Sequence, residues 1–450
     1  MPRRARRCSP AGPCDEGKGS CRRRSSAGPR SSRRQASRPI ELQQSHSAHR
    51  QEFQVSTEQS VSYARQAVGE RTAADAADRI DWVKLSLVYL PLAVPVSDAK
   101  VLTGRQKPLT EIAFIFAEVR TRDGHEGIGF GYSKRAGGPG MYAHAKELAP
   151  NLLGEDPNDI ARLFTHLQWA GASMGRSGLT TQAIAPFDIA LWDLKAKRAG
   201  LPLAKLLGAQ RNSVQCYNTS GGYLHTPLEQ VLRNVEISRE SGIGGIKIKV
   251  GQPDIATDLK RVAAVRELLG PDFHLMVDAN QQWDRTTAQR VGRRLEEHNL
   301  TWIEEPLDAY DIEGHAALAA SLDTPIATGE MLTSFGEHAQ LIMGNASDFV
   351  QPDAPRVGGI TPFLQIMQLA DFKGRKLAPH FAMEIHLHLA AAYPQEPWLE
   401  HFEWLEPMFN ERLQLKDGRM WVPARPGLGF SLSGQALAWT ADSAEFGKRP

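Results

Sequence analysis

The feature that most constrains the fold is a series of short apolar runs between Ile246 and Glu400, each ending in a charged or titratable residue. The runs recur at about the length of one strand and one helix, and each precedes a segment with helical periodicity. In order they are GIKIKVG, HLMVDAN, TWIEEP, PIATGE, DFVQPD, RKLAPH and WLEHFE. This pattern is typical of a parallel β/α barrel whose chemistry lies at the carboxyl ends of its strands. We expect these side chains to converge on one site: Lys247, Lys249, Asp278, Glu304, Glu330, Asp353, His380 and Glu400.

Length and composition limit the class of protein. A chain of 450 residues is long enough for more than one domain. No apolar run approaches the roughly 20 residues that a bilayer span needs, so we predict no membrane segment. Cys8, Cys14 and Cys21 lie in the first segment and Cys216 in a predicted strand. This is no disulfide framework, and we expect a protein of the reducing cytoplasm.

Residues 1–78 are rich in Arg, Ser and Pro and poor in large apolar residues, which predicts a disordered basic tail. Its arginine runs can bind nucleic acid or acidic surfaces. No aromatic residues interleave with the arginines, so we favour an unstructured solvated tail, or an extension from a start codon assigned too far upstream, over a nucleic-acid binder. A transit peptide is a further alternative, although the segment lacks a clean amphipathic period.

Residues 79–208 predict an α+β capping domain. Strands are expected at 82–90, 111–121 and 126–132, with a tight hairpin turn at Asp123-Gly124. Helices are expected at 141–152, 156–170 and 180–199, the last ending at Gly200-Leu201-Pro202. We place the catalytic barrel at 209–434, with 435–450 as a C-terminal end.

Two segments of the capping domain, 97–105 and 132–138, are rich in basic and small residues. Such loops can close over an anionic ligand, although spacing alone favours ordinary solvated hairpins. The neighbouring Gly127-x-Gly129-x-Gly131 pattern lies inside a predicted strand, so we do not interpret it as a phosphate-binding loop.

Lys247 and Lys249 are two residues apart on a predicted strand, so both side chains lie on the same face. If that face is the barrel interior, the two ammonium groups require an anionic ligand or nearby carboxylates. The opposite face of the strand can equally face the interior, because it carries the apolar residues Ile246, Ile248 and Val250. This strand alone leaves both arrangements open.

Asp278, Glu304 and Glu330 end three successive predicted strands and are each 26 residues apart. Taken singly, Asp278 can cap a helix and Glu304 can pair with an arginine. Three carboxylates at one rim repel one another unless a cation lies between them, and hard oxygen ligands suit Mg²⁺. We therefore predict a metal site, and we expect Glu305 to point the opposite way from Glu304.

Asp353 and His380 end two later strands and predict a catalytic pair. A carboxylate that accepts from one imidazole nitrogen fixes the tautomer and makes the other nitrogen a stronger base. His386 and His388 are expected on the following helix, where residues two apart do not face each other, so we do not interpret them as metal ligands.

These motifs carry a resemblance to a known family. KIKVG, MVDANQQW, WIEEPL, TGEML, QPDAPRVGGIT and LAPHFAMEIHLHLA, in this order and spacing, resemble the mandelate racemase group of the enolase superfamily. The wider sequence, over about residues 80–434, resembles acid-sugar dehydratases of that group. The resemblance implies an α/β fold, a modified parallel (β/α)7β barrel of the TIM type beneath an N-terminal α+β capping domain.

The resemblance also implies roles. Asp278, Glu304 and Glu330 would bind Mg²⁺, and Lys247 would add positive charge at the substrate carboxylate. Lys249 would be an acid/base on one face of the substrate, with a pKa lowered by its ammonium neighbour and the metal.

His380, supported by Asp353, would act on the opposite face. Glu400, if protonated, would donate a hydrogen bond to the developing enediolate, and Asn280 would contact the bound acid. The remaining candidates, for the distal end of a dicarboxylate, are Asp98, Lys100, Lys134 and Arg135.

The implied activity is Mg²⁺-dependent dehydration of a six-carbon aldaric acid, by α-proton abstraction and loss of the β-hydroxyl, in a homo-oligomer. An epimerase of the same acids is the nearest alternative, since it shares every residue up to the enediolate. A nucleic-acid-associated protein that acts through the basic tail is an alternative from a different class, which an intact site argues against.

The composition of the tail generates a first prediction. Because residues 1–78 contain few large apolar residues and so can bury little apolar area, deleting them should leave the thermal midpoint and the catalytic rate nearly unchanged. Thermal unfolding and turnover of the truncated and full chains provide the test. Loss of most of the activity, or failure to fold, would place the tail inside the working structure.

Overall fold

The computed structural model describes residues 78–219 and 221–448, and the predicted tail lies outside this range apart from Asp78. Asp78 pairs with Arg198 at 2.5 Å, so a truncation that preserves this ion pair begins at residue 78. Cys8, Cys14 and Cys21 also lie outside the described residues, whereas Cys216 is buried and free. None of the described helices is long and apolar enough to cross a membrane.

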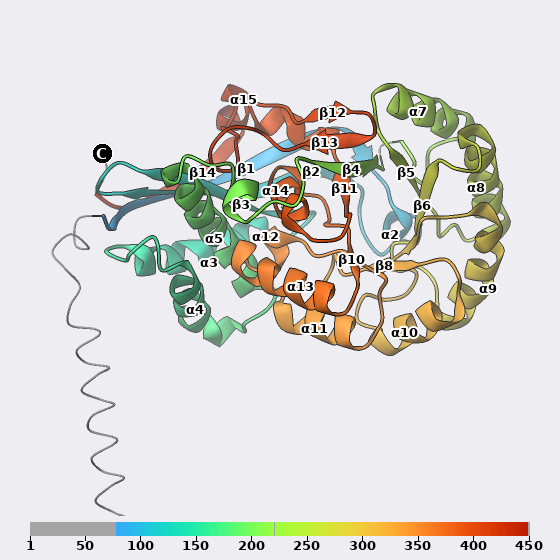
Figure 1. The fold of residues 1–450 in the computed structure, drawn as a ribbon, viewed down its shortest axis with the longest axis horizontal. Coiled ribbons are helices and arrows are strands. Elements are labelled where there is room, and N and C mark those ends of the chain that lie inside the picture. The colour runs from blue at the N-terminus through green and yellow to red at the C-terminus, as the bar shows by residue number, and fades with distance from the viewer. Residues whose placement is uncertain (1–77, 220, 449–450) are drawn as a thin grey trace, which may run out of the picture. The chain divides into compact units, whose positions relative to one another are not determined.

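Four antiparallel strands form a sheet in the order β14-β1-β2-β3 (Figure 1). Their bounds are Ile80–Val96 (β1), Leu109–Thr121 (β2), Glu126–Lys134 (β3) and Thr440–Gly447 (β14). The three strands expected from alternation are confirmed, and β2 and β3 join through the predicted turn, where Gly124 donates to the carbonyl of Thr121.

The fourth strand, β14, was missed because it has almost no apolar pattern. Most of its residues are exposed, and it is held by a backbone ladder that runs from Trp82↔Gly447 to Val88↔Thr440. Trp82 adds a side-chain bond from Nε1 to Glu445 at 3.2 Å. The segment predicted only as a C-terminal end therefore completes the sheet begun by β1.

Helices pack on one face of this sheet. Those in contact with the strands are α3 (Gly138–Leu148), η2 (Ala149–Leu152) and α5 (Leu179–Arg198). Both α4 (Ile160–Ala170) and η3 (Ala172–Met174) pack on α5. In chain order, the short α2 (Ala99–Leu102) falls between β1 and β2, and α6 (Leu203–Leu206) follows α5. Almost the whole length of α5 is buried, because one side packs on β3 and another on helices α12 (Ala354–Val357) and α13 (Ile360–Phe372). A helix with no exposed face shows no amphipathic period in its sequence.

The glycine pattern of β3 accounts for the close approach of α5. A Cβ atom on Gly127 would lie 2.0 Å from the carbonyl oxygen of Ala190, and one on Gly129 would lie 2.2 Å from that of Pro186. Only a strand face without side chains lets the helix backbone come this near. The Gly-x-Gly-x-Gly motif is thus a packing surface, in agreement with its rejection as a phosphate loop.

Eight parallel strands follow, and they build the barrel-like part of the chain. Their bounds are Ser213–Asn218 (β4), Gly245–Lys249 (β5), His274–Asp278 (β6), Ile303–Glu304 (β7), Ile326–Thr328 (β8), Phe349–Val350 (β9), Lys376–Leu377 (β10) and Trp398–His401 (β11). They are hydrogen-bonded in sequence order from β4 to β10, and β11 pairs with the other edge of β4.

The ring of strands is not closed by hydrogen bonds. Among the described residues no ladder joins β10 to β11, so the expectation of a modified (β/α)7β barrel of the TIM type is corrected to an α/β barrel-like domain with an N-terminal cap. Helix α14 (Met383–Ala392), buried along most of its length, connects the two strands and packs on β11 and β4. A short hairpin, β12 (Gln414–Lys416) with β13 (Arg419–Trp421), adds antiparallel to β4.

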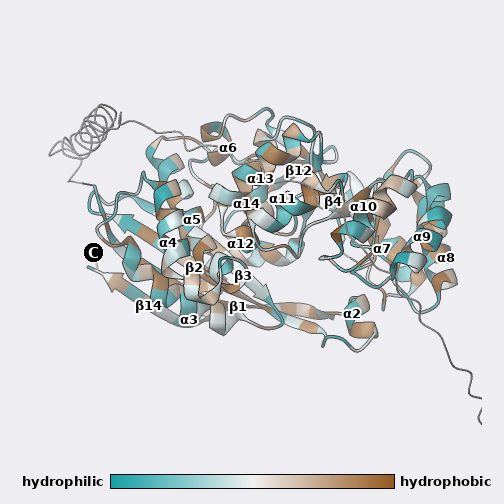
Figure 2. Cartoon of the chain, turned by 90° about the horizontal axis from the view of Figure 1, so that it is seen from below, coloured by the Kyte–Doolittle hydropathy of each residue, from teal (hydrophilic) through white to brown (hydrophobic). Residues whose placement is uncertain are grey.

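The outer helices follow one another around the strands (Figure 1). They are α7 (Leu228–Glu240), α8 (Ile255–Leu269), α9 (Arg285–Leu295) with η4 (Glu296–His298), α10 (Ile312–Ser321), α11 (Phe335–Met343) and α13, followed near the C-terminus by η5 (Glu403–Met408) and α15 (Gly434–Ala438). In α9 the buried residues Ala288, Val291, Gly292 and Leu295 form one stripe. The hydrophilic residues of α9 lie on its outer side (Figure 2).

An aromatic cluster fills the interior between the strands. Tyr217, Met276, Trp302, Phe349 and Trp398 pack together there, with the ring centroids of Tyr217 and Trp302 5.1 Å apart. Because side chains alternate along a strand, the residue two positions after each of these also faces inward. The cluster is therefore a floor beneath the strand ends that carry the charged residues.

The glycine face of β3 generates a second prediction. Gly129→Ala should lower the free energy of unfolding by about 2 kcal/mol, because the added methyl meets backbone atoms of α5 that cannot move independently. Gly131→Ala is the matched control, since its nearest neighbour would be the flexible methyl of Met141 at 3.2 Å. Chemical denaturation of both variants checks this, and equal stability of the two would contradict the packing role.

Candidate functional site

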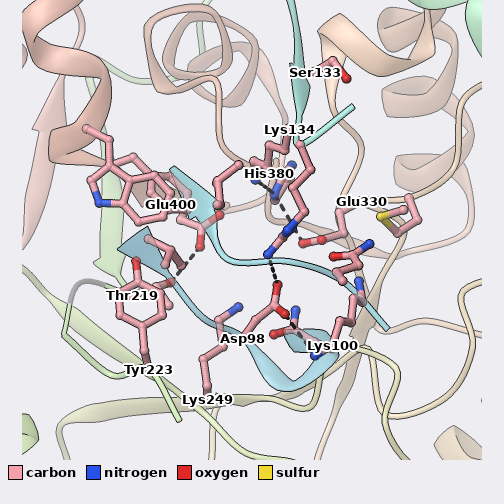
Figure 3. Close-up of a pocket in the computed structure, with 18 of the residues that line it drawn as sticks. Asp98, Lys100, Ser133, Lys134, Thr219, Tyr223, Lys249, Glu330, His380 and Glu400 are labelled. Carbon is pink, nitrogen blue, oxygen red and sulfur yellow. Dashed lines mark hydrogen bonds and ion pairs between the residues drawn. The ribbon is translucent and has the colours of Figure 1, made fainter. Parts of the chain in front are cut away.

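A cavity of about 340 Å³ opens at the carboxyl ends of the strands. It is lined by ten of the predicted site residues: Asp98, Lys100, Lys134, Arg135, Lys247, Lys249, Asn280, Glu330, His380 and Glu400. Figure 3 shows Lys249, Glu400, Glu330 and His380 entering this space from different sides. The other three, Asp278, Glu304 and Asp353, are fully buried behind the wall and bond directly to lining residues.

Lys247 and Lys249 lie on the inner face of β5. Ile246 and Ile248 belong to the outer hydrophobic core instead, where they pack with the helices. The structure thus resolves the two arrangements that the sequence left open. The ammonium of Lys247 also lies 5.1 Å from the ring centroid of Tyr217, at the top of the aromatic floor.

Lys247 is shared between two carboxylates. Its Nζ lies 2.5 Å from Glu304 and 2.8 Å from Glu400. Burial disfavours its charge, but these two acids outweigh that effect and hold the pKa of Lys247 well above its usual value. Lys247 is therefore a fixed positive charge.

Lys249 departs from the expected ionisation. Burial would lower the pKa of Lys249, yet the adjoining carboxylate of Asp278, to which its ammonium is hydrogen-bonded, raises that pKa above the usual value. The expectation of a lowered pKa placed weight on Lys247, whose opposing effect is smaller than that of Asp278. Lys249 is held as an ammonium while it keeps this partner.

Glu400 is also held in its charged form. Burial alone would raise the pKa of Glu400, but Lys247 lowers it below its usual range. Its two oxygens accept from Thr219 Oγ1 at 2.8 Å and from the backbone N–H of Phe381 at 3.4 Å. In this arrangement Glu400 is an ionised acceptor, so the condition of a protonated carboxyl, on which its role as a donor rested, is not met.

The strand register brings the acidic trio to neighbouring strand ends. Asp278 on β6 is directly opposite Glu304 on β7, and Glu330 follows the end of β8. In the described chain, however, no three His, Cys, Asp or Glu side chains form a ready cluster for a metal ion. Asp278 and Glu304 are turned instead toward Lys249 and Lys247.

The chemistry of this donor set nevertheless fits a hard divalent cation. Burial raises the pKa of Glu304 to about 8; Lys247 opposes this, whereas Asp278, Glu400 and Glu330 add to it. The negative charge at this rim is thus only partly balanced by the lysines. A cation with oxygen preference would relieve the remaining repulsion among the three carboxylates.

Glu305 lies beside the trio but does not line the cavity. Its backbone φ is 39°, so strand alternation ends at this residue. One carboxylate oxygen accepts from Nε2 of Gln281 at 2.8 Å, and the other has no hydrogen-bond partner among the described residues. Burial, followed by the charge of Glu330, raises the pKa of Glu305 well above its usual value.

Asp353 and His380 form the predicted pair. Nδ1 of His380 lies 2.8 Å from Oδ2 of Asp353, while Nε2 faces the cavity 3.4 Å from Glu330 and 3.3 Å from Nζ of Lys134. Asp353 also caps α12 by accepting from the N–H of Arg356 at 3.2 Å. The imidazole therefore has one nitrogen anchored in the wall and one directed into the cavity.

The two basic loops reach the cavity in different ways. Arg135 donates to Asp98 at 3.0 Å and to the carbonyl of Lys107 at 2.9 Å, so Asp98 and Arg135 largely neutralise each other at the loop. Lys134 extends further in and lies 4.1 Å from the ring centroid of Phe381. Lys100 lines the cavity from α2.

Several cavity residues were missed by sequence reasoning. Thr219, Tyr223, Arg356 and Trp404 line the space, and Tyr132 lies directly behind His380. Arg356 is within the quoted QPDAPRVGGIT motif, but nothing in the spacing distinguishes it. Alternation of Phe130 and Tyr132 along β3 was the one available signal for Tyr132, since it places both on the face opposite the glycines.

His386 and His388 lie on α14, as expected, and both bind backbone groups. His386 accepts from the N–H of Ala354 at 2.9 Å through Nε2, and His388 accepts from Ala204 at 3.1 Å through Nδ1. Burial lowers the pKa of each to about 4, which keeps the accepting nitrogens unprotonated. His386 thereby supports the chain next to Asp353.

Comparison with known protein families gives two matches along this chain. The family described as "Mandelate racemase / muconate lactonizing enzyme, N-terminal domain" matches residues 101–208, and "Enolase C-terminal domain-like" matches residues 230–436. The chain belongs to the enolase superfamily. Within that superfamily, the paired lysines, the acidic trio and the Asp353–His380 pair stand at the strand ends where the sequence resemblance placed them.

Close relatives of this superfamily member are known. The L-talarate/galactarate dehydratase of Salmonella typhimurium is 75% identical over 390 residues, which cover 87% of this chain and 98% of the relative. A crystal structure of that enzyme with Mg and L-lyxarohydroxamate has a TM-score of 0.83 at 76% identity and covers 85% of this chain and 97% of its own. An L-talarate dehydratase from Polaromonas sp. JS666, complexed with Mg and L-glucarate, has a TM-score of 0.81 at 69% identity, covering 83% and 100%.

The environment of Lys134 generates a third prediction. Burial lowers the pKa of Lys134 from 10.5 to about 8, against the opposing charges of Glu330, Glu400 and Asp353. The neutral amine should therefore accumulate as the pH rises through about 8. Competitive acylation across pH, read by mass spectrometry with exposed Lys260 as the reagent reference, should show half-maximal reactivity of Lys134 there. A midpoint near 10.5 would mean that the side chain is not desolvated.

Proposed function

We propose that this protein is a Mg²⁺-dependent acid-sugar dehydratase that acts on six-carbon aldaric acids of the galactarate and L-talarate type. The observation that carries the proposal is a single cavity with Lys249 and His380 at the ends of β5 and β10, with four strands between them, beside three buried carboxylates. The 75% identity to a dehydratase of these acids supports the substrate class.

Asp278, Glu304 and Glu330 would hold the Mg²⁺ ion. When bound, the ion supplies a Lewis acid that lowers the free energy of negative charge on the substrate carboxylate. Lys247 supports the same carboxylate as a fixed cation, because Glu304 and Glu400 keep it protonated. Asn280, whose Oδ1 has no partner among the described residues, lines the cavity close to Asp278 and contacts the same end of the substrate.

Lys249 and His380 exchange the α-proton. A neutral Lys249 amine requires release from Asp278, which is a predicted metal ligand, so the Lys249 ammonium and the cation would compete for this carboxylate. The cavity-facing Nε2 of His380 is the second acid/base, and Asp353 stabilises the imidazolium when it forms. The β-hydroxyl then leaves the enediolate as water by taking up a proton from the acid/base pair, and the resulting enol tautomerises to a keto-deoxy acid.

Lys100 and Lys134 supply cationic groups for the distal carboxylate, with Asp98 and Arg135 holding the loops that carry them. The same pair of acid/base groups also permits reprotonation from the opposite face, so epimerisation is a second candidate activity. Our proposal further includes a homo-oligomer in the cytoplasm and no nucleic-acid partner.

The proposal is tested with a panel of aldaric and aldonic acids. Purified full-length protein is incubated with each acid and Mg²⁺, and keto-acid formation is followed. Turnover of galactarate or L-talarate that requires Mg²⁺ is expected. Turnover of aldonic acids alone, or none of any acid, would overturn the assignment, and a salt-dependent DNA shift lost on deletion of the tail would favour the nucleic-acid alternative.

A fourth prediction concerns the metal ligands. Glu304→Gln removes one charge from the trio while keeping the shape of the side chain, so turnover should be abolished and the fold retained. Activity and circular dichroism check these two outcomes, and calorimetry measures Mg²⁺ binding. A folded Glu304→Gln protein that binds Mg²⁺ and turns over like the parent would remove Glu304 from the ligand set.

A fifth prediction concerns the two proton-exchanging residues. His380→Asn should suppress epimerisation, because inversion at C-2 requires both faces, while Lys249 still exchanges the proton of the epimer presented to it. The proton spectrum of substrate recovered after partial turnover in D₂O reports both outcomes. Undiminished formation of the other epimer would show that the two residues are not an opposed pair.

A further inference from the structure

A tyrosine from the cap sheet reaches the catalytic pair of the barrel-like part. Tyr132, near the end of β3, is buried, and its hydroxyl lies 2.5 Å from Oδ2 of Asp353 and 3.2 Å from Nδ1 of His380. Nδ1 of His380 is in turn 2.8 Å from the same Oδ2. The three groups therefore form a closed triangle of polar atoms.

The triangle determines where its hydrogens lie. The single hydroxyl hydrogen of Tyr132 points at Asp353, which is the only charged acceptor of the three. Nδ1 then faces two oxygen atoms, the carboxylate and the phenol, and satisfies both only if it carries a hydrogen. In the neutral ring, Nε2 consequently keeps its lone pair directed into the cavity, as a proton acceptor requires.

The phenol is held as a donor in one orientation. Burial, followed by the charge of Asp353, raises the pKa of Tyr132 well above its usual value, so it stays protonated. Its ring packs on Phe381 with 4.6 Å between centroids and on Phe114 with 6.1 Å. The hydroxyl position is thus fixed by packing, independently of the hydrogen bonds.

We propose that Tyr132 is a positioning residue that fixes the Nδ1–H tautomer and the ring orientation of His380 through Asp353. The cap domain thereby helps to determine which nitrogen of this base accepts a proton. This inference rests on the proposed function only for the reaction that His380 performs. The hydrogen-bond triangle itself exists without substrate. It also accounts for the two faces of β3, because the glycine face admits α5 while the opposite face delivers the hydroxyl.

The tautomer is measured first, because it requires no substrate. Protein labelled with ¹⁵N-histidine is studied by solid-state NMR at one fixed pH, and subtraction of the His380→Asn spectrum assigns His380. The parent should show a single Nδ1–H signal. Tyr132→Phe, which keeps the ring and its packing, should show a mixture of tautomers or a shifted Nδ1 signal. An unchanged His380 spectrum in Tyr132→Phe would overturn the proposal.

A matched control removes an equivalent hydroxyl elsewhere. The hydroxyl of buried Tyr393 donates to the backbone carbonyl of Arg375, just before β10 begins and so at the opposite end of the strands from the cavity. Tyr393→Phe should leave the His380 signals and the exchange rates unchanged. Equal effects of both variants would mean that the spectrum reports a general loss of stability.

Proton exchange in D₂O gives the second readout. With the substrate epimer whose exchange is abolished by His380→Asn, Tyr132→Phe should reduce kcat roughly 10–100-fold with little change in KM. With the epimer whose α-proton is exchanged by Lys249, kcat should stay within about twofold of the parent. A parallel fall for both epimers would indicate a misplaced cap and overturn the positioning role. If the parent turns over no acid, the proposed function fails, whereas the spectrum still decides the role of Tyr132.

Discussion

The site depends on one constraint, the close packing of opposite charges that are buried at the strand ends. Lys247 lies between Glu304 and Glu400, and Lys249 lies against Asp278. Ions cannot be removed from water without partners, so every charged group here determines the ionisation of its neighbours. Removing any one of them leaves an uncompensated charge in the wall, which is why these residues act as a unit.

The aromatic floor makes this packing possible. Tyr217, Met276, Trp302 and Trp398 fill the interior below, and the next inward positions along the chain are occupied by one hydroxyl and three carboxylate side chains. Strand alternation therefore separates a dry layer from a charged layer within two residues. The same alternation places Ile246 and Ile248 outside, against the helices.

Sequence reasoning located the residues of the site but did not establish their protonation states. Spacing and strand alternation placed Lys247, the acidic trio and His380 at strand ends, because such patterns are local. The ionisation of Lys249 and Glu400 could not be derived from the sequence, because it depends on which charged group each side chain meets in three dimensions. The role of Tyr132 could not be predicted either, because its two hydrogen-bond partners lie 221 and 248 residues away in the sequence. Strand β14 was missed for a different reason, since its sequence has too little apolar pattern to be recognised without its partner strand.

The pairing of β1 with β14 bears on how the chain is assembled during synthesis. The first and last strands of the described chain are neighbours in the cap sheet, so this edge cannot form until the whole barrel-like part has left the ribosome. Closing so long a loop is entropically costly unless the intervening segment is already compact. The barrel-like part should therefore fold before the cap sheet is completed, and nascent chains halted before Thr440 would carry a cap whose β1 edge is still unpaired.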